Sequence, residues 1–185
     1  MTRKKGVPLA NIAASVKARL LQRAHEDGED FNSLLVRYVL ERLLYRLGAS
    51  KNADDFVLKG ALLFVAWSAR PHRATKDLDL LVSGDGDNLE RVARALGAFG
   101  APRHIVEAAG RMTPTEIVYL GAPPVRIDIL RSADGIDTEE TIARAGSIHV
   151  GTLVVPIISR GDLIANKKAS GRAQDLADVA ALERV

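Results

Sequence analysis

The sequence has no cysteine, few aromatic residues and no long hydrophobic run. Without cysteine it can form neither disulfide bonds nor thiolate zinc sites, so we expect a reducing compartment. Aromatic residues make up only 4% of the chain, so alanine, leucine and valine must fill the core. The apolar residues near the amino end are too interrupted for a signal peptide or a membrane span. We therefore expect a cytoplasmic protein with no membrane partner.

The bulk composition is that of a globular protein. With 185 residues, of which 47% are hydrophobic and 26% charged, the chain can bury a core of its own. The net charge of +3 is uneven, because residues 1–51 hold ten Lys or Arg against five Asp or Glu. Such a basic region can bind nucleic acid by neutralising phosphates, although charged helix faces are more often simply solvated.

Hydrophobic periodicity predicts a mixture of helices and strands. Period-3.6 patterns and capping signals predict helices at 9–26, 30–48, 61–67, 89–99 and 138–145, one opened by Ser159, and one from 173 to the end. Alternating or short apolar runs predict strands at 57–58, 77–83, 103–108, 115–120, 125–130 and 152–158. The strands at 115–120 and 125–130 are close enough in sequence to be antiparallel neighbours.

Two aspartates stand at the start of an otherwise apolar strand, in "TKDLDLLV". Because side chains alternate along a strand, Asp77 and Asp79 point to the same face. Two adjacent carboxylates repel each other and raise each other's pKa unless a cation lies between them. A divalent metal is the natural partner, although Asp-x-Asp at a strand end is also common as a merely solvated pair.

A third carboxylate and a glycine turn extend this pattern. In "PVRIDIL", Asp128 lies on the polar face of a later strand, where Arg126 or Arg131 could also pair with it. Three carboxylates provide the hard oxygen ligands that Mg²⁺ prefers, and such sites serve phosphoryl transfer. Upstream, Gly60 opens a helix, where backbone N–H groups favour an anion and a missing Cβ lets phosphate approach.

This order of motifs resembles that of the DNA polymerase β-like nucleotidyltransferase superfamily. Within it, "FVLKGALLF" and "RATKDLDLLV" resemble the AbiEii/AbiGii-type toxins of bacterial toxin–antitoxin systems. Their Arg-x-(Ser/Thr)-x-Asp-x-Asp pattern is matched by Arg73, Thr75, Asp77 and Asp79. The tail "ISRGDLIANKKASGRAQDLADVAAL" is similar to the closing helices of that group, with matches at Lys167, Arg172, Asp175 and Asp178. The resemblance covers about residues 10–185.

The resemblance implies an α+β nucleotidyltransferase fold, with a small mixed sheet flanked by helices, an N-terminal helical pair and C-terminal helices. It implies a single domain over 1–185, made of a basic helical extension (1–51), a catalytic core (52–158) and C-terminal helices that complete the nucleotide site (159–185). The implied activity is transfer of a nucleoside monophosphate from an NTP to an acceptor hydroxyl, with release of pyrophosphate.

The resemblance also implies roles for individual residues. Asp77, Asp79 and Asp128 would bind two Mg²⁺ ions, or Mn²⁺, and Asp128 would take the proton of the acceptor hydroxyl. Lys167 is the fourth expected catalytic residue, and the expected nucleotide-binding residues are Lys59, Gly60, Ala61, Arg172 and Asp175. For Lys59 a solvated turn lysine is the alternative, and for Lys167 it is a structural contact with an aspartate of the next helix.

Several partners and functions stay open at this point. The expected partners are an NTP, a cognate antitoxin and an acceptor such as tRNA or other RNA, which basic residues of the first two helices could contact: Lys17, Arg19, Arg23, Arg37, Arg42 and Arg46. A protein or small-molecule acceptor is also open. Because Ala61 replaces the small glycine or serine of the family turn, one alternative is a catalytically inactive nucleotide- or partner-binding protein. Another treats residues 1–51 as a nucleic-acid-binding module on a scaffold.

Overall fold

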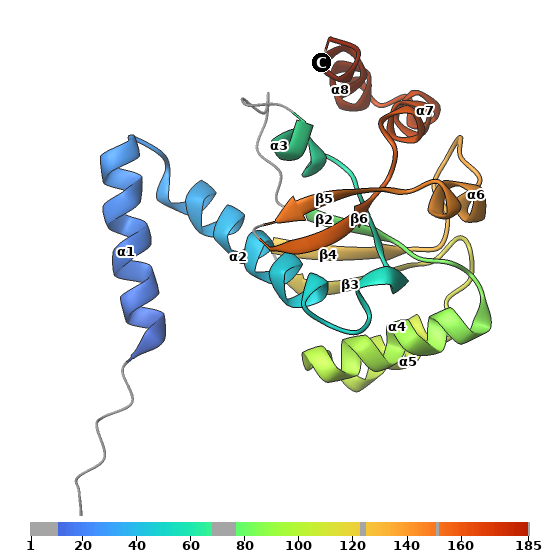
Figure 1. The fold of residues 1–185 in the computed structure, drawn as a ribbon, viewed down its shortest axis with the longest axis horizontal. Helices are drawn as coiled ribbons and strands as arrows, with labels where there is room; N and C mark the ends of the chain where they lie inside the picture. The colour runs from blue at the N-terminus through green and yellow to red at the C-terminus, as the bar shows by residue number, and fades with distance from the viewer. Residues whose placement is uncertain (1–10, 68–76, 123–124, 151, 185) are drawn as a thin grey trace, which may run out of the picture. The chain divides into compact units, whose positions relative to one another are not determined.

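The computed structural model describes residues 11–67, 77–122, 125–150 and 152–184 (Figure 1). The chain divides into two compact units, Met1–Tyr38 and Val39–Val185. None of the described helices is both long and apolar enough to cross a membrane.

The first unit contains helix α1 (Ile12–Asp27) and the beginning of helix α2 (Phe31–Gly48). The Asn11 side chain caps α1 by accepting a hydrogen bond from the Ala14 N–H at 3.0 Å, and Gly28 ends the helix in the left-handed conformation. Leu20, Ala24 and Leu34 form a small core. Both predicted N-terminal helices are confirmed, with a later start for α1.

The second unit is built on a six-stranded mixed sheet with the order β3-β4-β2-β1-β6-β5. Its strands are β1 (Val57–Lys59), β2 (Asp77–Leu81), β3 (Ile117–Ala122), β4 (Val125–Leu130), β5 (Gly146–Val150) and β6 (Leu153–Ile157). The pairs β2–β4 and β1–β6 are parallel, and the other three pairs are antiparallel. The predicted mixed sheet and the antiparallel β3–β4 neighbours are confirmed.

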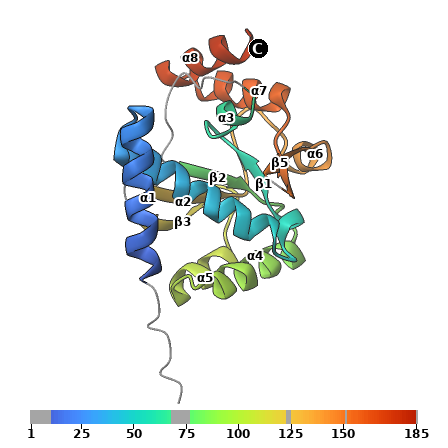
Figure 2. The same ribbon diagram turned by 60° about the vertical axis from the view of Figure 1, so that its left-hand side comes forward.

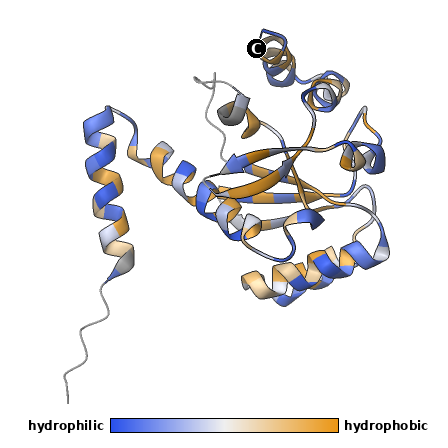
Figure 3. Ribbon diagram, viewed as in Figure 1, coloured by the Kyte–Doolittle hydropathy of each residue, from blue (hydrophilic) through white to orange (hydrophobic). Residues whose placement is uncertain are grey.

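Helices lie on both sides of this sheet. Figures 1 and 2 show α4 (Gly86–Phe99) and α5 (Arg103–Ala109) on one side, and α7 (Arg160–Ser170) and α8 (Ala173–Leu182) on the other. Shorter helical segments connect the strands: η1 (Ala53–Asp55), α3 (Leu63–Trp67) and α6 (Thr138–Ala143). In Figure 3 the strands are largely coloured as hydrophobic, whereas α4 alternates between the two colours, as expected for a helix with one buried face.

The two faces of the sheet differ in chemistry. Leu80, Ile127 and Ile129 point toward α4 and the second half of α2, where they line an apolar cavity of about 160 Å³. Because strand side chains alternate, Asp79 and Asp128 point to the opposite face, the one that α7 and α8 approach. The first face is therefore apolar where it meets α4, and the second carries the polar candidates beside buried Leu81.

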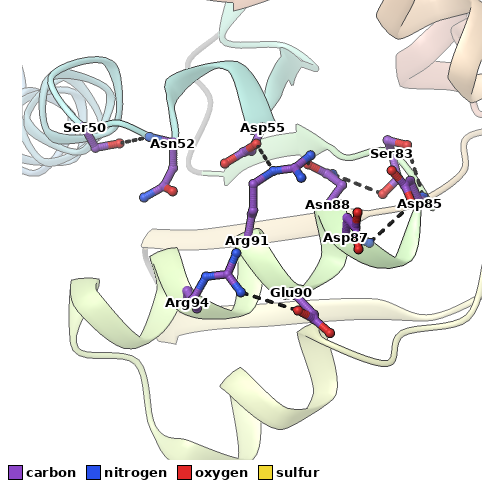
Figure 4. A network of polar contacts seen from close by, with 10 residues as sticks. All are labelled: Ser50, Asn52, Asp55, Ser83, Asp85, Asp87, Asn88, Glu90, Arg91 and Arg94. Atoms are coloured by element: carbon purple, nitrogen blue, oxygen red, sulfur yellow. Dashed lines mark hydrogen bonds and ion pairs between the residues drawn. The ribbon is translucent and has the colours of Figure 1, made fainter.

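A polar network fixes the segment that leads into β1 (Figure 4). Arg91 of α4 donates to Asp55 of η1 at 2.7 Å and to Asn88 at 3.1 Å. The Asn88 amide in turn donates to the Ser83 carbonyl just after β2, at 3.2 Å. The network thus ties α4 to the segments next to β1 and β2, the strands that carry Lys59 and the two aspartates.

One predicted element was wrong, and one element was missed. Residues 103–108 form α5 rather than a strand, because Pro102 stands at its N-cap and the short run Ile105-Val106 fits one turn of a helix packed on α4 as well as it fits a strand. Strand β5 was not predicted. It pairs with β6 alone at the sheet edge, and the alternation in its sequence "GSIHV" rests on only two apolar residues, too few to predict a strand.

Candidate active site

One row of paired residues crosses four neighbouring strands. The register pairs Tyr119 of β3 with Asp128 of β4, Asp128 with Asp79 of β2, and Asp79 with Lys59 of β1. Residues paired in register project to the same face of a sheet, so an aromatic ring, two carboxylates and an ammonium group share one face. We call these four residues the polar row.

The next row adds the remaining carboxylate. Asp77 is paired with Arg126 of β4, two residues along each strand from Asp79 and Asp128, and therefore on the same face. The structure thus brings together Asp77, Asp79 and Asp128, which are 51 positions apart at their extremes in the sequence. Two more members of the family pattern, Arg73 and Thr75, lie outside the described residues.

The turn after β1 fits closely against Asp79. Gly60 has φ +88°, and a Cβ at this position would lie 2.0 Å from an Asp79 carboxylate oxygen. Glycine is therefore needed at position 60 for two reasons: the backbone is in a left-handed conformation, and there is no room for a side chain. Ala61 follows, is 7% exposed, and lines the same cavity as Gly60.

Burial shifts the pKa values of both Lys59 and Asp79. Lys59 is 8% exposed, and its burial lowers the pKa of its ammonium group, an effect that nearby Asp79 opposes. Burial likewise raises the pKa of Asp79, with Asp128 and Asp77 adding to the effect and Lys59 opposing it. Within the described part of the chain, the Lys59 ammonium group makes no hydrogen bond or close ion pair. A buried lysine without such a partner beside a destabilised carboxylate is typical of a functional site.

The C-terminal helices contribute a buried ion cluster. The Lys167 ammonium of α7 donates to Asp175 at 3.0 Å and to Asp178 at 2.6 Å, both on α8, and Arg172 donates to Asp175 at 2.5 Å. Although burial works against it, these bonds from Arg172 and Lys167 lower the pKa of Asp175. The structural contact considered for Lys167 is thus present, and Lys167 also lines a cavity with Gly60 and Asp79.

Arg126 has more contacts in the site than the sequence predicted. Its guanidinium donates to both carboxylate oxygens of Asp128, at 2.6 and 2.8 Å, lies 3.9 Å from Asp77, and is 5.0 Å from the centre of the Tyr119 ring. The sequence offered Arg126 only as one of two partners for Asp128. The alternation of β4 puts it on the face of Asp128, but its approach to Asp77 and Tyr119 depends on registers between distant strands.

The carboxylates fit a divalent cation in their donor chemistry. They offer hard oxygen ligands on neighbouring strands. Burial and the repulsion between the carboxylates raise the pKa of Asp79, and a bound cation would offset both effects by stabilising the negative charge. As the side chains stand, no three His, Asp or Glu groups among the described residues are gathered closely enough to hold a metal ion. Arg126 instead supplies the positive charge beside Asp128 and Asp77.

Two cavities meet at the polar row. The first, of about 310 Å³, is lined by Gly60, Ala61, Lys167 and Arg172, and we call it the turn cavity. The second, of about 640 Å³, extends to Ile117 and Tyr119 of β3, and we call it the β3 cavity. Residues shared by both linings include Lys59, Asp79, Arg126, Asp128, Asn166 and Arg172.

Comparison with known proteins places the chain in a family. The family model described as "Nucleotidyl transferase AbiEii toxin, Type IV TA system" matches residues 42–184. The chain belongs to the AbiEii family. A nucleotidyltransferase-like antigenic protein from Paracoccidioides brasiliensis is 14% identical in sequence, with a TM-score of 0.43 over 80% of this chain and 74% of that one. No curated protein matches the chain. The expected relationship to AbiEii nucleotidyltransferase toxins is confirmed, and the roles of individual residues stay predictions.

Proposed function

We propose that this AbiEii family member transfers a nucleoside monophosphate from an NTP to a hydroxyl group of RNA, such as the end of a tRNA, and releases pyrophosphate. The observation that carries the proposal is the polar row, in which Asp79 and Asp128 lie between a buried lysine and an open cavity. Family membership supports nucleotidyl transfer, and the charge arrangement suits a triphosphate.

The triphosphate binds in the turn cavity. Gly60 and Ala61 offer backbone without bulky side chains, and Lys59, Lys167 and Arg172 supply positive charge near the phosphates. Asp77, Asp79 and Asp128 would hold Mg²⁺, which when bound neutralises phosphate charge and orients the substrates. The buried ammonium of Lys59 stabilises the charge that develops on departing pyrophosphate, because such a group acts strongly where water is excluded.

Asp128 accepts the proton of the attacking hydroxyl. It stands in the polar row between Asp79 and the β3 cavity, so it faces the side from which a second substrate can approach. Arg126 positions its carboxylate through two hydrogen bonds. We further propose that a cognate antitoxin restrains the activity and that it takes place in the cytoplasm, where NTPs and RNA are available.

The test is a labelling experiment with purified protein, Mg²⁺, total cellular RNA and each α-labelled NTP in turn. The test variant is Asp77→Asn/Asp79→Asn, which keeps side-chain size and removes charge. The matched control is Asp54→Asn, which changes an exposed carboxylate of η1 that lines neither the turn cavity nor the β3 cavity.

We expect label on a discrete RNA band with the wild type and with Asp54→Asn, and none with the double variant. Label on a protein would keep the chemistry and replace the acceptor. An unlabelled reaction, together with no Mg²⁺-dependent NTP binding, would favour the inactive protein of the same fold that the substitution at Ala61 suggests.

A further inference from the structure

The β3 cavity offers room for a second substrate beside the triphosphate. Its volume of about 640 Å³ falls in the range of pockets that hold nucleotide-sized ligands, and it shares Asp79 and Asp128 with the turn cavity. A group bound in the β3 cavity would therefore meet the triphosphate at the carboxylates. This is the arrangement that transfer between two substrates requires.

The wall of the β3 cavity contributed by β3 is an exposed apolar shelf. Tyr119 is 47% exposed and Ile117 is 39% exposed, and both project from the same face of an edge strand. Contiguous exposed hydrophobic side chains beside polar groups are typical of binding surfaces. A ring and an aliphatic side chain side by side suit a flat, partly apolar group such as a nucleobase.

Arg126 places a positive charge on this shelf. Its guanidinium lies 5.0 Å from the centre of the Tyr119 ring and stays 45% exposed while it bonds Asp128. Proteins that bind single-stranded RNA combine aromatic rings, on which bases stack, with arginine and lysine groups that contact phosphates. An acceptor hydroxyl of a protein would need neither feature, so the shelf favours RNA.

The buried end of the cavity is charged. Lys59 is 8% exposed, and its ammonium group makes no hydrogen bond or close ion pair with any described residue; it lines the β3 cavity together with Asp79 and Asp128. A ligand that stacks on Tyr119 would thus extend toward a buried polar end where its hydroxyl group meets the carboxylates.

We propose that the β3 cavity binds the 3′-terminal nucleotide of single-stranded acceptor RNA, with its base on Tyr119, its phosphate on Arg126 and its terminal hydroxyl at Asp128. This inference rests on the proposed function. In the reaction the hydroxyl oxygen forms a bond to the α-phosphorus of the NTP, and the bond from that phosphorus to the bridging oxygen of pyrophosphate breaks. The hydroxyl proton passes to Asp128, and pyrophosphate leaves from the turn cavity.

The hydrogen bonds from Arg126 to Asp128 fit this role of the β3 cavity. A phosphate that enters the β3 cavity competes with Asp128 for the guanidinium, because both groups accept the same paired N–H donors. Acceptor binding would therefore free the oxygens of Asp128 at the moment when a proton acceptor is needed. Asp128 is the residue through which acceptor binding and chemistry are coupled.

The test compares Tyr119→Ala with Tyr119→Phe, using the full chain and a fluorescein-labelled single-stranded RNA of about ten nucleotides with a free 3′ hydroxyl. Fluorescence anisotropy measures RNA binding, and calorimetry measures Mg·NTP binding separately. Tyr45→Ala is the matched control, because Tyr45 is also exposed, at 44%, and also lies beneath an arginine, with Arg42 4.7 Å from its ring centre.

We expect Tyr119→Ala to weaken RNA binding about tenfold, in line with the loss of one base–aromatic stack. Tyr119→Phe and Tyr45→Ala should bind RNA like the wild type, and all variants should bind Mg·NTP equally. Unchanged RNA affinity in Tyr119→Ala would overturn the inference. So would an equal loss of Mg·NTP affinity, which would assign the β3 cavity to the base of the NTP.

The binding assay needs no transfer, so the two proposals can fail separately. If the labelling experiment gives no label but Tyr119→Ala loses RNA binding as expected, the reaction is refuted and the RNA site stands. If RNA is labelled but Tyr119→Ala leaves the KM for RNA unchanged, the reaction stands and the RNA site is refuted.

Discussion

At the residue scale, Gly60 shows how closely the turn and the carboxylates are fitted. It adopts φ +88°, and its Cα hydrogens face the Asp79 carboxylate where a Cβ would be only 2.0 Å from oxygen. The family pattern of small residues at this turn thus has a structural reason before any nucleotide is considered. Any larger residue must displace the side chain that the site depends on.

We predict that Gly60→Ala lowers the free energy of unfolding by about 2 kcal/mol or more, from left-handed strain plus the clash with Asp79. The matched control is Gly100→Ala, because Gly100 has φ +96° and a Cβ added there would meet nothing within 4 Å, so only strain of about 1 kcal/mol should remain. Denaturant unfolding measures both values. Equal losses would show that Asp79 moves aside freely.

Arg126 and a metal ion compete for the same carboxylates. The guanidinium already bonds Asp128 at 2.6 and 2.8 Å and lies 3.9 Å from Asp77, so cation binding must replace at least part of these contacts. Hydrogen bonds to charged groups contribute about 1.5–3 kcal/mol, which sets the scale of the competition.

We predict that Arg126→Ala binds Mn²⁺ about tenfold more tightly than the wild type, because a competing cation of that strength is removed. Arg94→Ala, which removes an exposed arginine of α4, should bind Mn²⁺ like the wild type. Isothermal calorimetry without NTP or RNA measures the affinities. Weaker Mn²⁺ binding by Arg126→Ala would mean that Arg126 orients Asp128 for the metal.

At the element scale, α7 matters because it carries Lys167 and Asn166 into the site. Ser159 opens this helix as predicted. The Asp162 N–H donates to the Ser159 hydroxyl at 3.1 Å, and this hydroxyl donates to the Asp162 carboxylate at 2.6 Å. Arg144, next to the end of α6, adds bonds of 2.6 and 3.0 Å to the same carboxylate. Asp162 therefore fixes the start of α7 against the segment before it.

Asp162 also gives the fold a pH dependence with a definite sign. Hydrogen bonds from Arg144, helped by Ser159 and opposed by burial, lower the pKa of Asp162 in the folded protein. A carboxyl group with a lowered folded pKa stabilises the fold above its unfolded pKa of about 3.9, and this contribution is lost as the pH falls through the folded value.

We predict that Asp162→Asn lowers the free energy of unfolding by about 1 kcal/mol at pH 7, a modest value because Arg144 is half exposed. The difference from wild type should stay constant down to about pH 5 and shrink below about pH 4. Glu140→Gln removes the other, 73% exposed partner of Arg144 and should cost less than about 0.5 kcal/mol. A difference that grows on acidification would contradict this account of Asp162.

Local signals predicted the elements that carry the site better than those that do not. β2 and β4 were predictable because polar and apolar residues alternate in them, and α7 was predictable because Ser159 is a typical N-cap residue. α5 and β5 were not, since a short apolar run and an edge strand satisfy either structure until their neighbours are known. The cluster of Arg126, Asp77 and Tyr119 depends on the β3–β4–β2 register, which no local pattern contains.

At the scale of the whole molecule, the candidate active site lies in one unit, and the basic helix α1 lies in the other. The family match begins at residue 42, inside α2, and the polar row and both cavities belong entirely to the unit Val39–Val185. The unit Met1–Tyr38 has α1 with exposed basic side chains and a small core of its own. The predicted single domain with a basic extension over 1–51 stays a proposal, in which this first unit binds the RNA backbone.

We predict that replacing Lys17, Arg19 and Arg23 together by alanine weakens RNA binding and lowers its salt dependence, with no change in Mg·NTP affinity. These side chains are exposed on a helix that alanine favours, so folding should be unaffected. If each contacts one phosphate of a single strand, the slope of log K against log salt should fall by about 0.7 per residue, or about 2 in all.

The matched control replaces three exposed arginines of the second unit, Arg94, Arg103 and Arg111, and so removes the same charge from the molecule. Because long-range attraction depends on total charge and phosphate contacts depend on position, only the α1 variant should change the slope by about 2. Equal slopes in the wild type and the α1 variant would exclude the first unit from RNA binding. The β3 cavity would then have to select the RNA by its 3′ end alone.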